Sequence, residues 1–190
     1  KLAPSLIAAA LQDSSPELRI AARQVLIRIN PQAAVSELGK AISAGTIAEQ
    51  QASLAALAGM NDKAADEELG SALASLLGQG EIPPEIQLDV VVALEKRGRS
   101  EVAKAILESL ASQPYGRSHL ATRGGDAARG AEIFSNNVAL SCTRCHKAGE
   151  SGGRVGPNLA GIGAKKSPEY LLESIVDPNK VIAEGFGTLV

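Results

Sequence analysis

Aromatic residues are almost absent from this chain of 190 residues. It contains two Phe, two Tyr and no Trp, although hydrophobic residues make up 45% of the sequence. Any core must therefore be built mainly from Leu, Ile, Val and Ala, a balance that favours packed helices over sheets. The length suffices for two small domains that each bury a core. The composition thus predicts an all-α protein of two domains.

Strong net charge and long apolar runs are lacking as well. The formal net charge is −2, and the isoelectric point is about 5.8. Nothing in these totals indicates an electrostatic surface for nucleic acid or anionic lipid. The longest apolar runs, such as residues 2–11, are short and interrupted by Pro and Ser, whereas a membrane span needs about 20 apolar residues. We therefore expect no nucleic-acid partner and no membrane span in this chain.

The first 112 residues follow the period of amphipathic helices. Leu, Ile, Val and Ala return every three or four residues. Three similar segments begin 31 and 37 residues apart, the size of a two-helix repeat, and they cover residues 16–26, 47–57 and 84–94. The sequence predicts an α-solenoid over residues 1–112, and its first segment resembles the HEAT repeat family. An irregular helical bundle with accidental similarity is the alternative.

The composition changes after this helical part. Residues 113–124 are rich in Pro, Gly, Ser, Tyr and Arg and have no helical period, which is typical of a linker. A short helix is expected over Asp126 to Phe134. We therefore place a second domain at residues 125–190.

Both cysteines of the chain lie in one motif, Cys142-Thr-Arg-Cys145-His146. This is the attachment pattern of a c-type haem, in which two thiols add to the haem vinyl groups and the next residue ligates the iron. On a helical turn, residues at i, i+3 and i+4 project to the same side and can face one porphyrin. The motif predicts one covalent haem c through Cys142 and Cys145, with His146 as the iron ligand.

Three other interpretations of the motif are weaker. A zinc site would need four ligands, and the one other histidine is His119. A thioredoxin-like redox pair would need a preceding strand and a βαβ context. The third alternative is a plain pair of cysteines packed beside a histidine.

The surroundings of the motif resemble a class I cytochrome c domain over about residues 124–186. The resemblance rests on residues 125–134, the motif itself and residues 152–162. Residues 170–186, together with the HEAT-like part, resemble the large haem-binding domain family described from planctomycetes and verrucomicrobia. This resemblance implies a small helical haem domain after the repeats.

The resemblance also implies roles for individual residues. Pro157 would offer its carbonyl group to the ring nitrogen of His146 that does not face the iron, which fixes the ring. The other expected haem contacts are Phe134, Leu159 and Ile162, with Arg154 beside a haem propionate. Leu171, Leu172, Ile175 and Val176 would complete the apolar wall. Ordinary packing of the apolar residues, and a solvated Arg154, remain as alternatives.

The sixth iron ligand is left open by the sequence. Cytochromes of this class use a methionine after the histidine, and no methionine follows His146. The candidates are His119, Met60, a water molecule and a residue beyond Val190. Residues 186–190 are typical of the start of a β-strand, so we expect the haem domain to be truncated at this end.

The function that follows is electron transfer through the haem, between one redox partner and another. The repeats would serve as a docking scaffold, and the resemblance implies a dehydrogenase-like partner or attached domain and a periplasmic or otherwise extracytoplasmic location. The pattern favours an electron-transfer module over an enzyme. One alternative is a haem sensor or peroxidase-like protein with an open sixth iron position, and another is a HEAT-type interaction protein. A basic rim for an acidic partner would comprise Arg144, Lys147, Arg154, Lys165 and Lys166.

Overall fold

A computed structural model describes residues 3–109 and 112–187 of the chain. Helices dominate it, and the two strands that it contains in these ranges are two residues long each. The prediction of an all-α fold is therefore confirmed. The chain forms two compact units, residues 1–109 and 110–190, which are described separately below.

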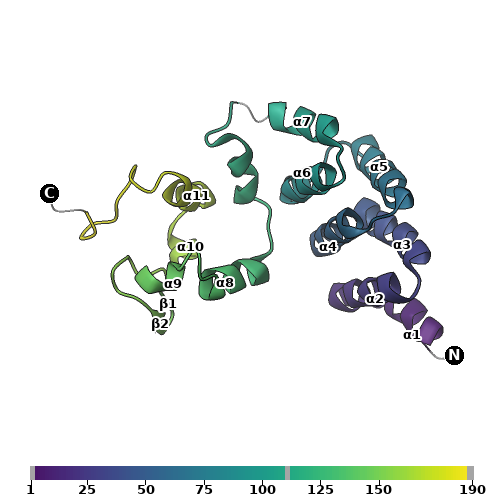
Figure 1. Ribbon diagram of the computed structural model, residues 1–190, viewed down its shortest axis with the longest axis horizontal. Helices are drawn as coiled ribbons and strands as arrows, with labels where there is room; N and C mark the ends of the chain where they lie inside the picture. The colour runs from purple at the N-terminus through teal and green to yellow at the C-terminus, as the bar shows by residue number, and fades with distance from the viewer. Residues whose placement is uncertain (1–2, 110–111, 188–190) are drawn as a thin grey trace. The chain divides into compact units, whose positions relative to one another are not determined.

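The N-terminal unit is built from consecutive helices that pack in two layers. Helices α2, α4 and α6 lie side by side in one layer, and α3 and α5 pack against them in the other (Figure 1). The elements are α1 (Ala3–Ala10), α2 (Pro16–Ile29), α3 (Pro31–Ala44), α4 (Ile47–Gly59), α5 (Lys63–Gly78), η1 (Pro84–Ile86), α6 (Gln87–Lys96) and α7 (Ser100–Ser109). The core is aliphatic, with Leu38, Ile42, Leu54, Leu57, Leu69 and Val90 fully buried. The three similar segments fall on α2, on α4 and on η1 with α6.

Helix starts in this unit follow from the local sequence. Pro16 and Pro31 occupy the first turns of α2 and α3, where a missing N–H group costs nothing. The side chain of Ser15 accepts a hydrogen bond from the amide of Leu18. The side chain of Asn30 does the same for the start of α3. These caps explain why α2 and α3 follow one another with a single residue between them.

A buried carboxylate joins α2 to α4. Glu49 is 1% exposed, and its oxygens accept hydrogen bonds from Arg19 Nε at 2.8 Å, Arg19 Nη2 at 2.6 Å and Arg23 Nη1 at 2.8 Å. The same side chain accepts from the Thr46 amide at 3.0 Å and so closes a capping box at the start of α4. Glu49 therefore links α2 to α4, and it also gives the Thr46 amide at the start of α4 a hydrogen-bond acceptor.

A third arginine holds the C-terminal end of α4. Arg97, after α6, donates to Asp66 at 2.6 Å and to the Asp62 carbonyl oxygen at 2.7 Å, and it also contacts the Met60 carbonyl oxygen. Met60 is the residue that ends α4, and the side chain of Asp62 caps α5. One guanidinium therefore holds the α4–α5 connection against the end of α6.

The C-terminal unit consists of short elements. They are η2 (Gly116–Thr122), α8 (Ala127–Asn136), α9 (Cys142–Cys145), β1 (Lys147–Ala148), β2 (Ser151–Gly152), α10 (Ile162–Lys165) and α11 (Pro168–Val176). Strands β1 and β2 pair as an antiparallel hairpin. Asp126 caps α8 through the amide of Arg129, which agrees with the helix expected to start there. The strand expected over residues 186–190 falls mostly on residues outside the described part, and Phe186 and Gly187 lie in no strand.

The segment predicted as a linker, residues 113–124, contains η2. This 3-10 helix packs on α11 and buries Leu120, which is 4% exposed. The Tyr115 hydroxyl donates a hydrogen bond to Glu173 on α11 at 2.9 Å. A single buried leucine in a short 3-10 turn has no periodicity to detect, so the sequence pattern did not indicate this element.

None of the helices in the described ranges combines the length and apolar character that a membrane crossing requires.

Candidate haem site

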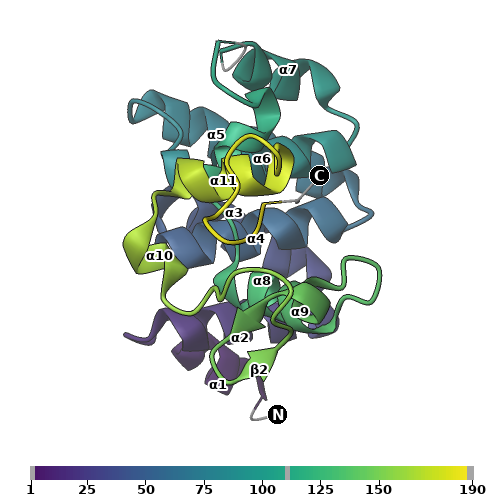
Figure 2. The same ribbon diagram turned by 90° about the vertical axis from the view of Figure 1, so that its left-hand side faces the viewer.

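The cysteines of the motif lie on α9, a single helical turn. Both thiols are free, Cys142 half-buried and Cys145 exposed. Ser141 precedes the turn in the left-handed region, at φ 49°, and the His146 amide closes the turn by donating to the Cys142 carbonyl oxygen at 3.0 Å. The predicted helical spacing of the two thiols and the imidazole is therefore present in the backbone. Figure 2 turns the C-terminal unit towards the viewer and labels α9.

The orientation of the His146 ring is fixed by a backbone carbonyl. Its Nδ1 atom lies 3.0 Å from the carbonyl oxygen of Pro157. Because a carbonyl group can only accept, Nδ1 must carry the proton of this hydrogen bond. The lone pair of the neutral imidazole is then on Nε2, which is the arrangement that a metal-ligating histidine uses.

A glycine-rich loop wraps around the motif and holds it. The amide of Gly153 donates to the Thr143 carbonyl at 2.8 Å, and that of Gly156 to the Cys145 carbonyl at 2.8 Å. A Cβ atom on Gly153 would lie 2.0 Å from the Arg144 carbonyl oxygen. The loop therefore approaches the motif backbone more closely than any side chain permits.

Gly156 packs directly against the imidazole. A Cβ atom at this position would lie 2.7 Å from Cε1 and 2.9 Å from Nδ1 of His146. The ring is thus held between the Pro157 carbonyl and the bare backbone of Gly156. Sequence reasoning did not single out Gly153 and Gly156, and the available signal was the density of glycines in residues 152–156.

We expect Gly156→Ala to displace the His146 ring without removing the cysteines. The haem would stay attached, but the added methyl group would break the Nδ1 hydrogen bond and weaken the iron–imidazole bond, by roughly the 10- to 100-fold typical of losing such a supporting contact. The fraction of high-spin haem in the visible spectrum measures this. Gly163→Ala is the matched control, because a Cβ atom there meets nothing within 4 Å. An unchanged spectrum in Gly156→Ala would contradict the packing role.

A cavity of about 600 Å³ opens beside the motif, within the size range of small-molecule and cofactor pockets. Cys145, His146, Pro157, Leu159 and Ile162 all line it. The remaining lining residues are Val155, Gly156, Lys166, Tyr170, Leu171, Ser174, Pro178, Val181, Ile182, Ala183, Glu184 and Phe186. The wall is mainly aliphatic, and its far side comes from α11 and the segment that follows it.

Not every residue named from the sequence lies at this cavity. Arg154 lines an adjoining hollow of about 280 Å³, together with Lys147 and Asn158, and this hollow shares Gly156 and Phe186 with the cavity. Phe134, on α8, is half-buried and is not among the lining residues of either space. Ile175 is 79% exposed and is absent from the cavity wall as described, as are His119, Cys142, Leu172 and Val176.

The C-terminal unit has almost no apolar core of its own. Among its described residues, Leu120 is the one buried hydrophobic side chain. Val155, Val181, Ile182 and Phe186 are between 42% and 77% exposed and all line the cavity. Apolar side chains that surround a space instead of packing together fit a large apolar group. With two thiols on one turn and a correctly oriented imidazole, the residues present therefore fit a covalently bound haem.

The comparisons with known proteins agree with this geometry. No curated protein and no solved structure matches the chain. Residues 127–187 match the family model of cytochrome c, and this range includes α8, the motif, the glycine loop and the whole cavity wall. The C-terminal unit therefore carries a cytochrome c domain, the kind of domain that transfers electrons through haem.

Proposed function

We propose that this protein transfers single electrons through one haem c, bound by Cys142, Cys145 and His146. The observation that carries the proposal is the 3.0 Å contact between His146 Nδ1 and the Pro157 carbonyl oxygen, on the wall of an apolar cavity. When bound, the haem supplies a reversible one-electron couple between ferric and ferrous iron.

The chain's own residues hold, orient and enclose the group. Cys142 and Cys145 fix it to α9 by thioether bonds. Gly156 and Pro157 set the angle of the His146 ring. Leu159, Ile162 and Leu171 exclude water from the cavity, and a dry surrounding disfavours the more highly charged ferric state. No residue needs to act as an acid or base.

The N-terminal helices are proposed to be a docking scaffold of HEAT-like repeats. The stacking of α2, α4 and α6 in one layer supports this, as does the regular spacing of the similar segments. The partner would be a redox protein or an attached dehydrogenase-like domain, as in the haem-binding family from planctomycetes and verrucomicrobia that the chain resembles. Because c-type haem is attached outside the cytoplasm in that family, we place the protein in the periplasm or another extracytoplasmic compartment.

The visible spectrum of the protein, produced together with c-type haem maturation machinery, tests the proposal. We expect a Soret band, and an α-band in the reduced form that remains after denaturation and acid–acetone extraction, since thioether bonds keep the haem on the chain. A protein without a Soret band would refute haem binding.

Carbon monoxide separates electron transfer from the alternative. A reduced spectrum that carbon monoxide does not change indicates a filled sixth position and supports electron transfer. A high-spin spectrum that shifts with carbon monoxide would favour a haem sensor or peroxidase-like role instead.

A further inference from the structure

Lys166 and Tyr170 form a polar corner in the wall of the haem cavity. Lys166 ends α10, and Tyr170 lies in the first turn of α11. The ammonium Nζ of Lys166 is 4.3 Å from the centre of the Tyr170 ring, a distance at which a cation is attracted to an aromatic face. Both side chains line the cavity that His146 lines. The ring therefore holds a positive charge at the edge of this cavity.

Few other groups in the cavity wall can meet a negative charge. Apart from the motif residues, the ionisable side chains that line it are Lys166, Tyr170 and Glu184. The hydroxyl of Ser174 also lines it, but donates to the Tyr170 carbonyl oxygen at 2.9 Å. The cations nearest in sequence to the motif, Lys147 and Arg154, line the adjoining hollow and are not among the lining residues of the cavity itself.

We propose that Lys166, held by the ring of Tyr170, binds a haem propionate and so positions the haem in its cavity. The inference rests on the proposed function. Haem carries two carboxylates at one edge, and a carboxylate brought to an apolar wall needs a charged or hydrogen-bonding partner. Lys166 supplies the charge and Tyr170 can supply an O–H donor beside it. This assigns to Lys166 the role that the sequence suggested for Arg154.

A cation at this place also stabilises the reduced iron. Ferrous haem has one positive charge less than ferric haem, so a nearby ammonium repels it less. Removing the charge of Lys166 should therefore favour the oxidised form. At a fixed ambient potential, we expect the ratio of reduced to oxidised protein to fall by roughly two- to fifteenfold, as for one charge about 10 Å away at an effective dielectric constant between 80 and 20.

Potentiometric titration of the haem-loaded protein tests the inference, with the substitution Lys166→Gln. Lys166→Arg keeps the charge and should restore the wild-type ratio. The matched control is Lys165→Gln, because this neighbouring lysine is exposed like Lys166 but lies outside the cavity wall. Arg154→Gln tests whether Arg154, and not Lys166, is the cation that binds the propionate. Equal shifts in Lys166→Gln and Lys165→Gln, or a shift confined to Arg154→Gln, would overturn the proposal.

A structure of the haem-loaded wild-type protein gives a test that needs no variant. Lys166 Nζ within hydrogen-bond distance of a propionate oxygen would support the proposal, and an ammonium directed away from both propionates would overturn it. Failure of the proposed function and failure of the inference about Lys166 give different results. A wild-type protein without haem refutes the proposed function, whereas a haem-loaded protein insensitive to Lys166→Gln refutes this inference alone.

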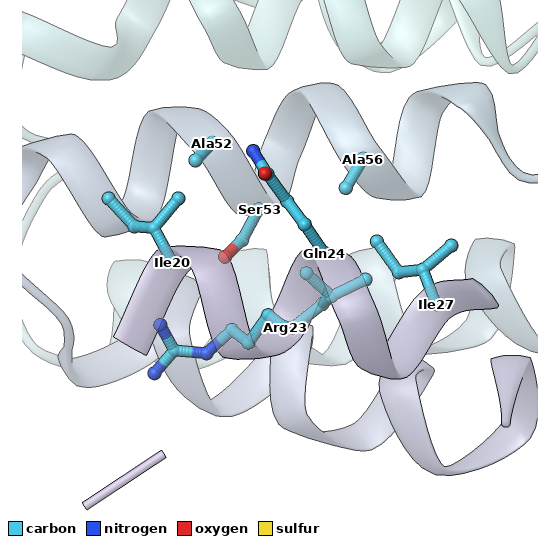
Figure 3. Close-up of a pocket in the computed structure, with 8 residues that line it drawn as sticks. Ile20, Arg23, Gln24, Ile27, Ala52, Ser53 and Ala56 are labelled. Carbon is cyan, nitrogen blue, oxygen red and sulfur yellow. The ribbon is translucent and has the colours of Figure 1, made fainter. Parts of the chain in front are cut away.

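A second inference concerns the interface of α2 and α4 and does not depend on the haem. Arg23 is 8% and Ser53 is 1% exposed, yet Arg23 Nε and Ser53 Oγ have no hydrogen-bond partner among the described residues. Both side chains line a cavity of about 10 Å³. Figure 3 shows the Ser53 hydroxyl pointing from α4 towards α2, the helix that carries Arg23 and Gln24. The other lining residues are Ile20, Ile27, Leu38, Ala52 and Ala56.

We infer that one water molecule binds in this cavity and bridges Arg23 Nε to Ser53 Oγ. Buried polar groups are costly when left unpaired, by about 1 to 3 kcal/mol, and a volume near 10 Å³ is the least that holds one water. The charges of Arg19, Arg23 and Glu49 sum to one positive charge, which would attract an anion. Chloride is larger than water, however, and the cavity has no room for it.

A high-resolution crystal structure, with and without a bromide soak, tests this second inference. We expect a density peak within hydrogen-bond distance of both atoms and no anomalous bromide signal. In Ser53→Val the peak should be lost, because the side chain fills the space. An empty cavity in the wild type, or bromide at the site, would overturn the assignment.

Discussion

Replacement of both Cys142 and Cys145 by alanine is expected to unfold the C-terminal unit while the N-terminal unit stays folded. The reason is the distribution of buried side chains. The N-terminal unit buries its own core of aliphatic residues, whereas Leu120 is the one buried hydrophobic side chain among the described residues of the C-terminal unit. A unit whose apolar side chains line a cavity of about 600 Å³ loses the group that would cover them when the haem is no longer attached.

Hydrogen exchange followed by mass spectrometry measures this result for each unit separately. In the double variant, amide protection in α8, α10 and α11 should fall almost to the level of an unfolded chain, while α3 and α4 exchange as in the wild type. Thr143→Ala is the matched control, because it changes the same helical turn and keeps both thiols. Wild-type protection of α11 in the double variant would show that the unit has a sufficient core without haem.

The regular features of the fold were predictable because they depend on neighbouring residues. Prolines and capping side chains mark the starts of α2 and α3, and the apolar period marks the helices themselves. The motif could be interpreted for the same reason, since Cys142, Cys145 and His146 lie within five residues and need only one helical turn. Local chemistry of this kind is readable without knowing the rest of the fold.

Features that depend on distant residues could not be predicted. Arg19 and Glu49 are 30 residues apart, and nothing in the pattern around either one indicates the other. Lys166 was expected in a basic rim, but its place in the cavity wall follows from the turn between α10 and α11, while the glycine loop carries Arg154 to an adjoining hollow. Similarly, the need for glycine at position 156 arises from the His146 ring that packs on it. Tertiary contacts decide such positions, and they are invisible to composition and period.

The largest effect on stability is expected from Glu49→Ala in the N-terminal unit. Glu49 receives hydrogen bonds from Arg19, Arg23 and the Thr46 amide, and its carboxylate is nearly inaccessible. Removing it leaves the Arg23 guanidinium buried without a counter-charge and opens the cap of α4. Breaking a buried ion pair from one side costs about 3 to 5 kcal/mol. Urea unfolding of the N-terminal unit, followed by far-ultraviolet circular dichroism, measures the loss.

A surface ion pair provides the control, and pH provides a second test. Glu67→Ala breaks an exposed pair with Lys63 and should cost less than about 1 kcal/mol of unfolding free energy.

The pKa of Glu49 lies far below its usual range. Hydrogen bonds from Arg19 lower this pKa most, and those from Thr46 and Arg23 lower it further, while burial acts in the opposite direction. The folded state then binds this proton more weakly than the unfolded state. The contribution of Glu49 is therefore complete above the ordinary pKa of about 4.3 and is lost progressively at lower pH. The stability difference between wild type and Glu49→Ala should be largest near pH 7 and clearly smaller at pH 3. A difference independent of pH would mean that Glu49 stabilises by packing and not by its charge.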